Sequence, residues 1–194
     1  MVPGIDSFRE KFKDYTIIGG TACDILLAEA DLTFRATKDI DMILILEDNF
    51  PEFASIFWEY IKEGGYKCGW KNEENMHFYK FMMSGRKTVD GLGVLGAEHL
   101  IPFKMYAWIN LLDRKRAGEH VNEKDLKKHK YDVFRLLQIV TAGIKVESEG
   151  LVAESIHRCI EEISAADETK VRLLQMGLPF DREQGMELLK EIYL

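Results

Sequence analysis

The chain has 194 residues, 46% of them hydrophobic and 30% charged, which is the composition of a globular protein large enough to bury one good core. This composition excludes a disordered or fibrous protein. No run of 18 uncharged apolar residues is present, and no apolar stretch follows a basic N-terminus, so we expect a cytoplasmic protein without a membrane partner. The three cysteines lack the spacing of a zinc or redox site and are expected to be free thiols.

The net charge of −7 is unevenly distributed along the chain. From Arg114 to Lys130, seven Lys or Arg residues stand against three Asp or Glu, whereas from Val146 to Leu194 the numbers are five and eleven. Binding nucleic acid over a whole surface needs clustered cations, so this acidic protein is not expected to do so. The basic run is either the solvated face of a helix or a local patch for phosphates. The acidic C-terminal helices are a candidate surface for a protein partner.

The first half of the chain alternates helical and β-rich segments. The predicted helices here cover residues 5–13, 22–29 and 51–61. The predicted strands cover residues 15–18, 40–46, 66–70, 76–83 and 86–89. The last two strands are expected to form a hairpin through Ser84 and Gly85.

From Ala97 onward the apolar residues repeat at the helical period. A long helix is predicted to begin, or to be interrupted, near Pro102. Further helices are predicted at 126–140, 151–163 and 183–193, with a loop at 176–179. The expected fold is α/β of the α+β kind. Residues 1–96 would form a small mixed sheet with flanking helices, and residues 97–194 a helical region packed on that core.

Two acids, Asp39 and Asp41, stand at positions i and i+2 where the chain enters the apolar strand 40–46. Side chains alternate along a strand, so both carboxylates lie on one face. Two adjacent carboxylates repel and are costly to desolvate, unless they point to water or to a cation. Oxygen ligands of this kind suit Mg²⁺ or Mn²⁺. The pattern therefore predicts a divalent metal site.

A pair of glycines, Gly19 and Gly20, separates the short apolar strand 15–18 from the next helix. Glycine allows close backbone approach, and the free N–H groups of a helix N-terminus bind anions. A triphosphate is a natural anion for such a turn. Taken alone, a pair of glycines is more often only a turn. The glycine pair followed by the Asp39 and Asp41 pair is more specific than either pair alone.

Strand, Gly19-Gly20, helix and then Asp39-Ile40-Asp41 on the next strand resemble the nucleotidyltransferase superfamily related to DNA polymerase β. Within it, Gly19-Gly20-Thr21-Ala22 with Arg35-Ala36-Thr37-Lys38-Asp39-Ile40-Asp41 is most similar to the AbiEii-type toxin-like proteins of bacterial abortive-infection systems. The segment Lys104-Met105-Tyr106-Ala107, then Arg114 and Lys128-His129-Lys130-Tyr131-Asp132-Val133, resembles that family's downstream helical motif. The gap of eighteen residues between Gly20 and Asp39 is long, and His129 stands where an acid is usual.

The resemblance implies a metal bound by Asp39, Asp41 and a third carboxylate on a neighbouring strand. Asp90 is the candidate for that third ligand. Because Gly91 follows it, Asp90 is equally typical of a turn residue without a role in metal binding. Asp132 either supports the site or pairs with a nearby Lys.

The implied substrate is a nucleoside triphosphate. Gly19, Gly20 and Thr21 would bind its phosphates, with Lys38 and Lys104 as further contacts. Each lysine has a simpler alternative. Lys38 could be an exposed cation of a loop, and Lys104 could reach solvent from the edge of an apolar helix face.

The function expected from these motifs is the Mg²⁺-dependent transfer of a nucleoside monophosphate from a nucleoside triphosphate to an RNA end, a protein or a small molecule. RNA and an antitoxin-like protein are the partners that the resemblance suggests. The alternative is a non-catalytic nucleotide-binding or regulatory module that retains the fold. Convergence of Asp90 with Asp39 and Asp41 would favour the enzyme, and a third acid elsewhere would favour the module.

Overall fold

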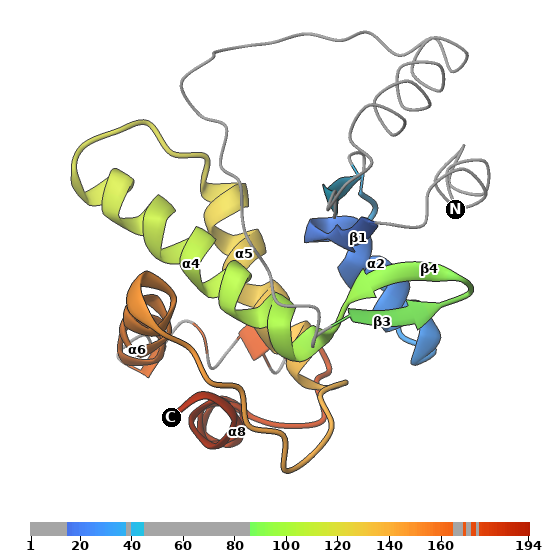
Figure 1. Cartoon of the computed structure of the whole chain (residues 1–194). Coiled ribbons are helices and arrows are strands. Elements are labelled where there is room, and N and C mark those ends of the chain that lie inside the picture. The colour runs from blue at the N-terminus through green and yellow to red at the C-terminus, as the bar shows by residue number, and fades with distance from the viewer. Residues whose placement is uncertain (1–14, 38–39, 45–85, 165–168, 170–171, 174) are drawn as a thin grey trace, which may run out of the picture. The chain divides into compact units, whose positions relative to one another are not determined.

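The computed structural model describes residues 15–37, 40–44, 86–164, 169, 172–173 and 175–194 (Figure 1). These residues contain four strands and five helices of at least 11 residues, so the predicted α+β fold with a small sheet and flanking helices is confirmed. The elements predicted at 5–13, 51–61, 66–70 and 76–83 lie outside the described residues, as do Lys38 and Asp39. Within the described part, no helix is both long and apolar enough to cross a membrane.

The chain divides into two compact units. The first consists of Met1–Ile25 with Arg35–Leu95 and contains the sheet; the second consists of Leu26–Phe34 with Gly96–Leu194 and contains the C-terminal helices. The division after Leu95 falls where the hydrophobic period changes from strand-like to helical. Leu26–Phe34, which holds the end of the first helix, belongs to the helical unit although it lies early in the sequence.

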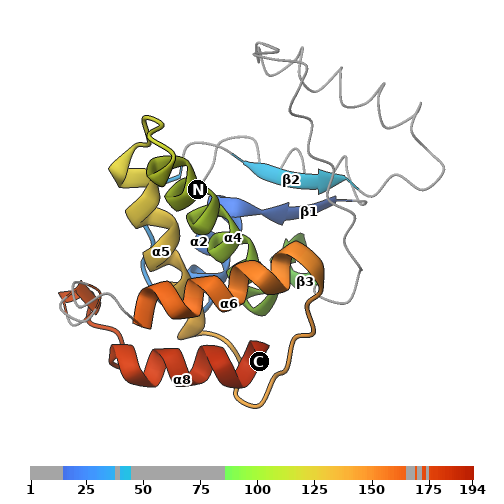
Figure 2. The ribbon, with the colours of Figure 1, turned by 90° about the vertical axis from the view of Figure 1, so that its left-hand side faces the viewer.

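The sheet has the strand order β2-β1-β4-β3. Its strands are β1 (Tyr15–Ile18), β2 (Asp41–Leu44), β3 (Arg86–Val89) and β4 (Leu92–Leu95). β1 is antiparallel to β2, which lies beside it in Figure 2, and parallel to β4, and β3 is antiparallel to β4. The helix α2 (Gly19–Glu29) follows β1 directly, three residues earlier than the sequence predicts. Its early start places both glycines in the first turn of the helix.

A two-residue turn, Asp90 and Gly91, joins β3 to β4. Both residues have positive φ angles, of 48° and 77°, as a type I′ hairpin turn requires. Asn, Asp and Gly tolerate this conformation best, which explains the Asp-Gly pair at this place. The sequence analysis predicted β3 and missed β4.

The helical unit contains α4 (Ala97–Arg116), α5 (Glu123–Leu137), α6 (Gly150–Ser164) and α8 (Arg182–Tyr193). α4 packs against α5 and α6, and α8 packs against α5 and α6 (Figures 1 and 2). Apolar side chains from all four helices fill the core between them: Leu100, Ile101, Met105, Val133, Phe134, Leu136, Ile156, Ile163 and Leu189. The helical period of these residues is the signal that predicted the four helices.

Pro102 lies inside α4 and neither begins nor interrupts the helix. A proline has no N–H, so the carbonyl of Glu98, four residues earlier, loses its helical donor. The hydroxyl of Tyr193, at the end of α8, donates to that carbonyl at 2.7 Å in a buried position. The C-terminal helix thereby satisfies the backbone group that Pro102 frees.

Candidate functional site

The Asp41 carboxylate lies against the backbone of Gly19 at the end of β1. In the sheet Asp41 pairs with Ile18, the residue before Gly19. A Cβ atom at Gly19 would overlap Oδ2 of Asp41 and lie 2.8 Å from its Cγ, and the φ angle of Gly19 is +70°. Both the left-handed backbone and the space taken by Asp41 therefore require glycine. Asp41 as a residue is exposed, and its Oδ2 lies against Gly19 at the start of α2.

The second glycine is covered by the segment that leads to the acids. A Cβ atom at Gly20 would lie 2.8 Å from Cγ2 of Thr37 and 3.7 Å from Nη2 of Arg35. The guanidinium of Arg35 thus lies close to the first turn of α2, which is the positive end of the helix dipole. Arg35 was also a possible phosphate contact from the sequence, but the contact of Arg35 and Thr37 with Gly20 was not predicted.

The interior side of the turn is tightly packed. Thr21 is 1% exposed, so its side chain is part of the core rather than of the open surface. The thiol of Cys23, which is buried, donates to the carbonyl of Gly19 at 3.0 Å. This bond helps to hold the Gly19 peptide in the orientation that Asp41 meets.

The structure does not bring Asp90 to Asp41. β4 runs parallel to β1, so it begins at the end of the sheet where β1 begins. The turn that holds Asp90 comes immediately before β4, whereas Asp41 faces the last residue of β1. The two carboxylates therefore lie at opposite ends of the strands. Asp90 serves as the first residue of a hairpin turn, and its assignment as a third metal ligand is not retained.

A hard carboxylate oxygen such as that of Asp41, on an exposed residue next to the N-terminus of α2, fits one ligand position of Mg²⁺ or Mn²⁺. Asp39, the second predicted ligand, lies outside the described residues, and so does Lys38. Among the described residues, no group of three or more His, Cys, Asp or Glu side chains is placed to hold a metal ion.

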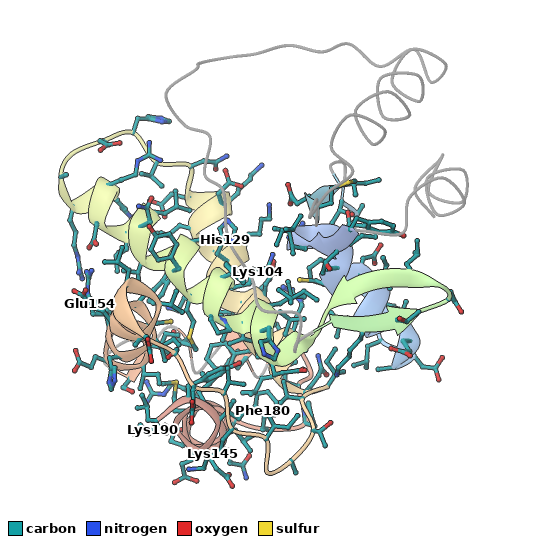
Figure 3. The ribbon with its side chains drawn as sticks, viewed as in Figure 1. Lys104, His129, Lys145, Glu154, Phe180 and Lys190 are labelled. Carbon is teal, nitrogen blue, oxygen red and sulfur yellow. The ribbon has the colours of Figure 1, made fainter. Side chains whose placement is uncertain are left out.

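Lys104, which is labelled in Figure 3, lies in the helical unit. Its side chain is paired with Asp132. Its Nζ is 3.6 Å from Oδ2 of Asp132, and the side chains are 5% and 0% exposed. Asp132 also accepts a hydrogen bond from Arg135 at 3.2 Å, and the guanidinium of Arg135 lies 5.9 Å from the ring of Phe34. Of the two roles considered for Asp132, pairing with a nearby Lys is the one observed. Contact of Lys104 with a phosphate stays a prediction.

His129 lies near this pair, one turn before Asp132 on α5 (Figure 3). Burial, together with the positive charges of Lys104 and Lys128, lowers the pKa of His129 to about 4, and the opposing effects of Asp132 and Asp125 are smaller. The imidazole is therefore neutral at pH 7. The charged partner of Lys104 in this part of the helical unit is therefore Asp132.

Comparisons with known proteins do not assign the chain to a family. No family model, no curated protein and no solved structure matches it. The resemblance to nucleotidyltransferases therefore rests on the motifs in the sequence, and the function has to be argued from the geometry around Gly19 and Asp41.

Proposed function

We propose that this protein binds a nucleoside triphosphate with Mg²⁺ at the corner formed by Gly19, Gly20 and Asp41 and transfers its nucleoside monophosphate to an acceptor hydroxyl. The observation that supports the proposal is the contact of the Asp41 carboxylate with Gly19 at the N-terminus of α2. It places a candidate metal ligand beside N–H groups that favour phosphate. Such a site works mainly by positioning and charge neutralisation.

In this reaction the acceptor oxygen forms a bond to the α-phosphorus, and the bond from that phosphorus to the bridging oxygen of the β-phosphate breaks. Pyrophosphate leaves with the electron pair, and the hydroxyl proton passes to solvent through the carboxylates. The bound divalent ion would supply neutralisation of the phosphate charge. Asp41 and Asp39 would hold the ion, the N–H groups of the Gly19–Gly20 turn would bind phosphate oxygens, and Arg35 would add a positive charge.

Within the helical unit, Asp132 holds the ammonium of Lys104. Truncating Lys104 does not test its phosphate contact alone. Breaking a buried ion pair costs about 3–5 kcal/mol when the remaining charge has no other partner, and less for Asp132, which would keep its contact with Arg135. Unfolding free energy and nucleotide affinity must therefore be measured together for Lys104→Ala.

The location of Asp90 favours a second candidate function, a nucleotide-binding or regulatory module without transferase activity. A catalytic site of the proposed kind uses a third carboxylate, and Asp90 does not supply it. Under this alternative the Gly19–Asp41 corner would still bind nucleotide with Mg²⁺.

One experiment separates the two functions. The protein is incubated with each α-labelled nucleoside triphosphate, Mg²⁺ or Mn²⁺ and total RNA, and label is sought in RNA and in protein. The transferase should label one of them in wild type and in Asp90→Asn, which preserves the turn, but not in Asp41→Asn. Equal labelling by Asp41→Asn would refute the site. Nucleotide binding that depends on Asp41 without any labelling would establish the non-catalytic module.

A further inference from the structure

A cavity of about 340 Å³ lies among α4, α5 and α6, entirely within the helical unit. It shares no residue with the Gly19–Asp41 corner, so binding here does not rest on the proposed function. Its volume falls at the lower end of small-molecule sites, which span roughly 300–1,000 Å³. A dry apolar cavity of about 150 Å³ holds benzene, so this one has room for about two rings.

Two buried aromatic rings and two leucines form the apolar part of the wall. Trp108 and Tyr131 are 5% and 9% exposed, and the half-buried Leu112 and Leu126 line the pocket with them. Contact with a ligand would remove more of the apolar surface of both leucines from water. Aromatic rings also attract one another, at an offset or edge to face, beyond the effect of the area that they bury. The wall therefore favours an apolar ligand that contains an aromatic ring.

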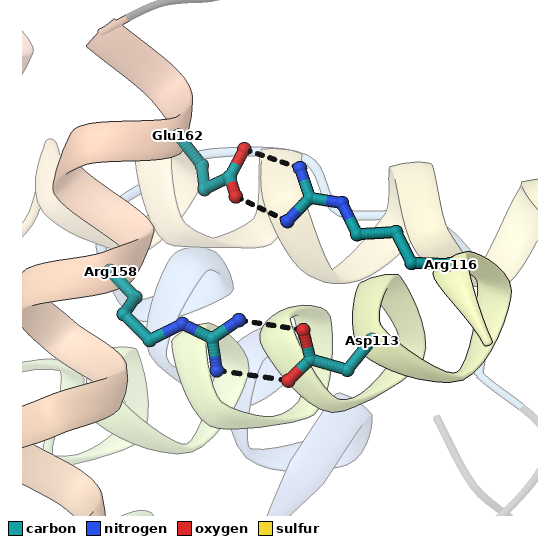
Figure 4. Close-up of polar contacts among 4 residues, drawn as sticks. All are labelled: Asp113, Arg116, Arg158 and Glu162. Carbon is teal, nitrogen blue, oxygen red and sulfur yellow. Dashed lines mark hydrogen bonds and ion pairs between the residues drawn. The ribbon is translucent and has the colours of Figure 1, made fainter.

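The two carboxylates in the wall are already engaged. Glu123 binds Lys115 at 2.5 Å, and these side chains are 57% and 47% exposed. Glu162 accepts two hydrogen bonds, at 2.5 and 2.9 Å, from the guanidinium of Arg116, which does not itself line the pocket (Figure 4). These hydrogen bonds are the main cause of the lowered pKa of each glutamate, so both stay ionised at neutral pH. A cationic ligand would have to displace one of these partners.

The remaining cations of the wall, Lys127 and Lys130, give an anion little to bind. Lys130 is not free, because its Nζ lies 5.4 Å from the ring centre of Trp108 and 5.8 Å from that of Tyr131. Lys127 is exposed, so water solvates its charge. A pair with such an exposed charge changes affinity by about fivefold at most. The charges of the wall therefore favour a neutral ligand.

The same pairing bears on the basic run at residues 114–130. Three carboxylates bind its first three cations: Glu119 binds Arg114, Glu123 binds Lys115 and Glu162 binds Arg116. Cations that are already paired offer less charge to a phosphate. The structure thus favours the solvated helix face over a phosphate patch for this part of the run.

We propose that this pocket binds a small, neutral aromatic molecule of one or two rings. The ligand would pack against Trp108, Leu112 and Leu126, and a hydroxyl or N–H group on it would face the exposed pair of Lys115 and Glu123. Because α4, α5 and α6 all contribute to the wall, the bound molecule would contact three helices at once and stabilise their packing.

The test is calorimetric titration with indole, and with indole-3-acetate as an anion that carries the same rings. Wild type should bind indole, and the anion should bind no more than about fivefold tighter. Phenol and cyclohexanol test the preference for an aromatic ring at nearly equal size. Phenol should bind about two- to tenfold more tightly, as expected from an aromatic pair.

Two variants locate the site. Leu112→Trp fills the pocket and should weaken the binding of indole by at least about tenfold. The matched control is Leu111→Trp, at the neighbouring half-buried leucine of α4, which does not line the pocket; it should keep the affinity within about twofold. Leu126→Gln keeps the length of the side chain but makes it polar, and should weaken binding even where Leu112→Trp does not fold. Circular dichroism and urea unfolding check the fold of each variant.

The possible outcomes decide the proposal. It would be overturned if wild type bound neither indole nor phenol at about 10 mM, roughly the weakest affinity of interest. Equal losses in folded Leu112→Trp and Leu111→Trp, or undiminished binding by a folded Leu126→Gln, would also overturn it. Indole-3-acetate that binds at least about tenfold tighter than indole would refute the neutral class. Cyclohexanol that binds as tightly as phenol would refute the aromatic class.

Discussion

Two features require glycine at position 19: the backbone is left-handed, and the Asp41 carboxylate occupies the place of a Cβ atom. Gly19→Ala should therefore lower the free energy of unfolding by more than the about 1–2 kcal/mol that the backbone conformation alone costs. Gly118→Ala is the matched control, because Gly118 has φ +85° and open space around it. Urea unfolding of both variants measures the difference. Equal losses would mean that Asp41 does not occupy the space at Gly19.

His129 should make the protein less stable at mildly acidic pH. Its pKa is lowered to about 4 in the folded state, mainly by burial. Below the unfolded pKa of about 6.5, the unfolded chain takes up a proton that the folded chain does not. Stability is then lost as pH falls from about 6.5 to about 4, by at most about 3 kcal/mol.

His129→Gln should flatten this pH dependence in thermal melts recorded between pH 7 and pH 4. His157→Gln provides the control, since His157 is exposed on α6. Identical pH profiles for wild type and His129→Gln would show that the imidazole is not held neutral by burial.

The helix α8 supplies a hydrogen bond that α4 lacks at Pro102, from the Tyr193 hydroxyl to the Glu98 carbonyl. Tyr193→Phe removes the hydroxyl group that donates to the Glu98 carbonyl. Pro102 has no N–H and cannot replace this donor at the buried carbonyl. The expected loss in unfolding free energy is about 1–3 kcal/mol, measured by urea denaturation. Tyr106→Phe, on a half-buried tyrosine of α4, should cost less. A Tyr193→Phe variant as stable as wild type would indicate that water replaces the hydroxyl.

Two ion pairs of opposite direction connect α4 to α6 (Figure 4). Asp113 binds Arg158 at 2.6 and 2.9 Å, and one turn along α4 Arg116 binds Glu162. Exposed pairs contribute little to stability, but the alternation of sign opposes a shift of one helix along the other. Asp113→Arg, which sets three arginines together, should lower the melting temperature more than Asp113→Asn. Adding Arg158→Asp should restore most of the loss, and a double variant no better than the single one would argue against a direct pair.

The helices and three of the four described strands could be predicted from the spacing of their residues. β4 could not, since all four of its residues are buried and Gly93 weakens its β-propensity, so no alternation marks it. The N-terminus of α5 was placed three residues late because its cap, Asn122, precedes a charged first turn that carries no apolar signal. A side-chain oxygen of Asn122 accepts from the N–H of Lys124 at 3.0 Å, and this bond fixes the helix start.

At the scale of the whole molecule, the candidate site was predictable only where it is local in sequence. Gly19 directly follows β1 and Asp41 begins the neighbouring strand β2, and the order of their motifs indicated that they would meet. The place of Asp90 depends on the order and direction of strands, which no local pattern reveals: a parallel β4 carries the preceding turn to the far end of the sheet. Pairing of Lys104 with Asp132 likewise depends on the packing of α4 on α5.

Binding of the proposed ligand should stabilise the folded molecule. A ligand that binds only the folded state adds RT ln(1 + [L]/Kd) to stability, about 2.7 kcal/mol at a concentration of 100 Kd. A nucleoside triphosphate with Mg²⁺ should therefore raise the melting temperature of wild type, and Asp41→Asn should lose most of that rise because the carboxylate beside Gly19 no longer holds the ion. Asp90→Asn should keep it, since its turn lies at the other end of the strands. A rise that survives in Asp41→Asn and disappears in Asp90→Asn would place the nucleotide at the hairpin end of the sheet instead.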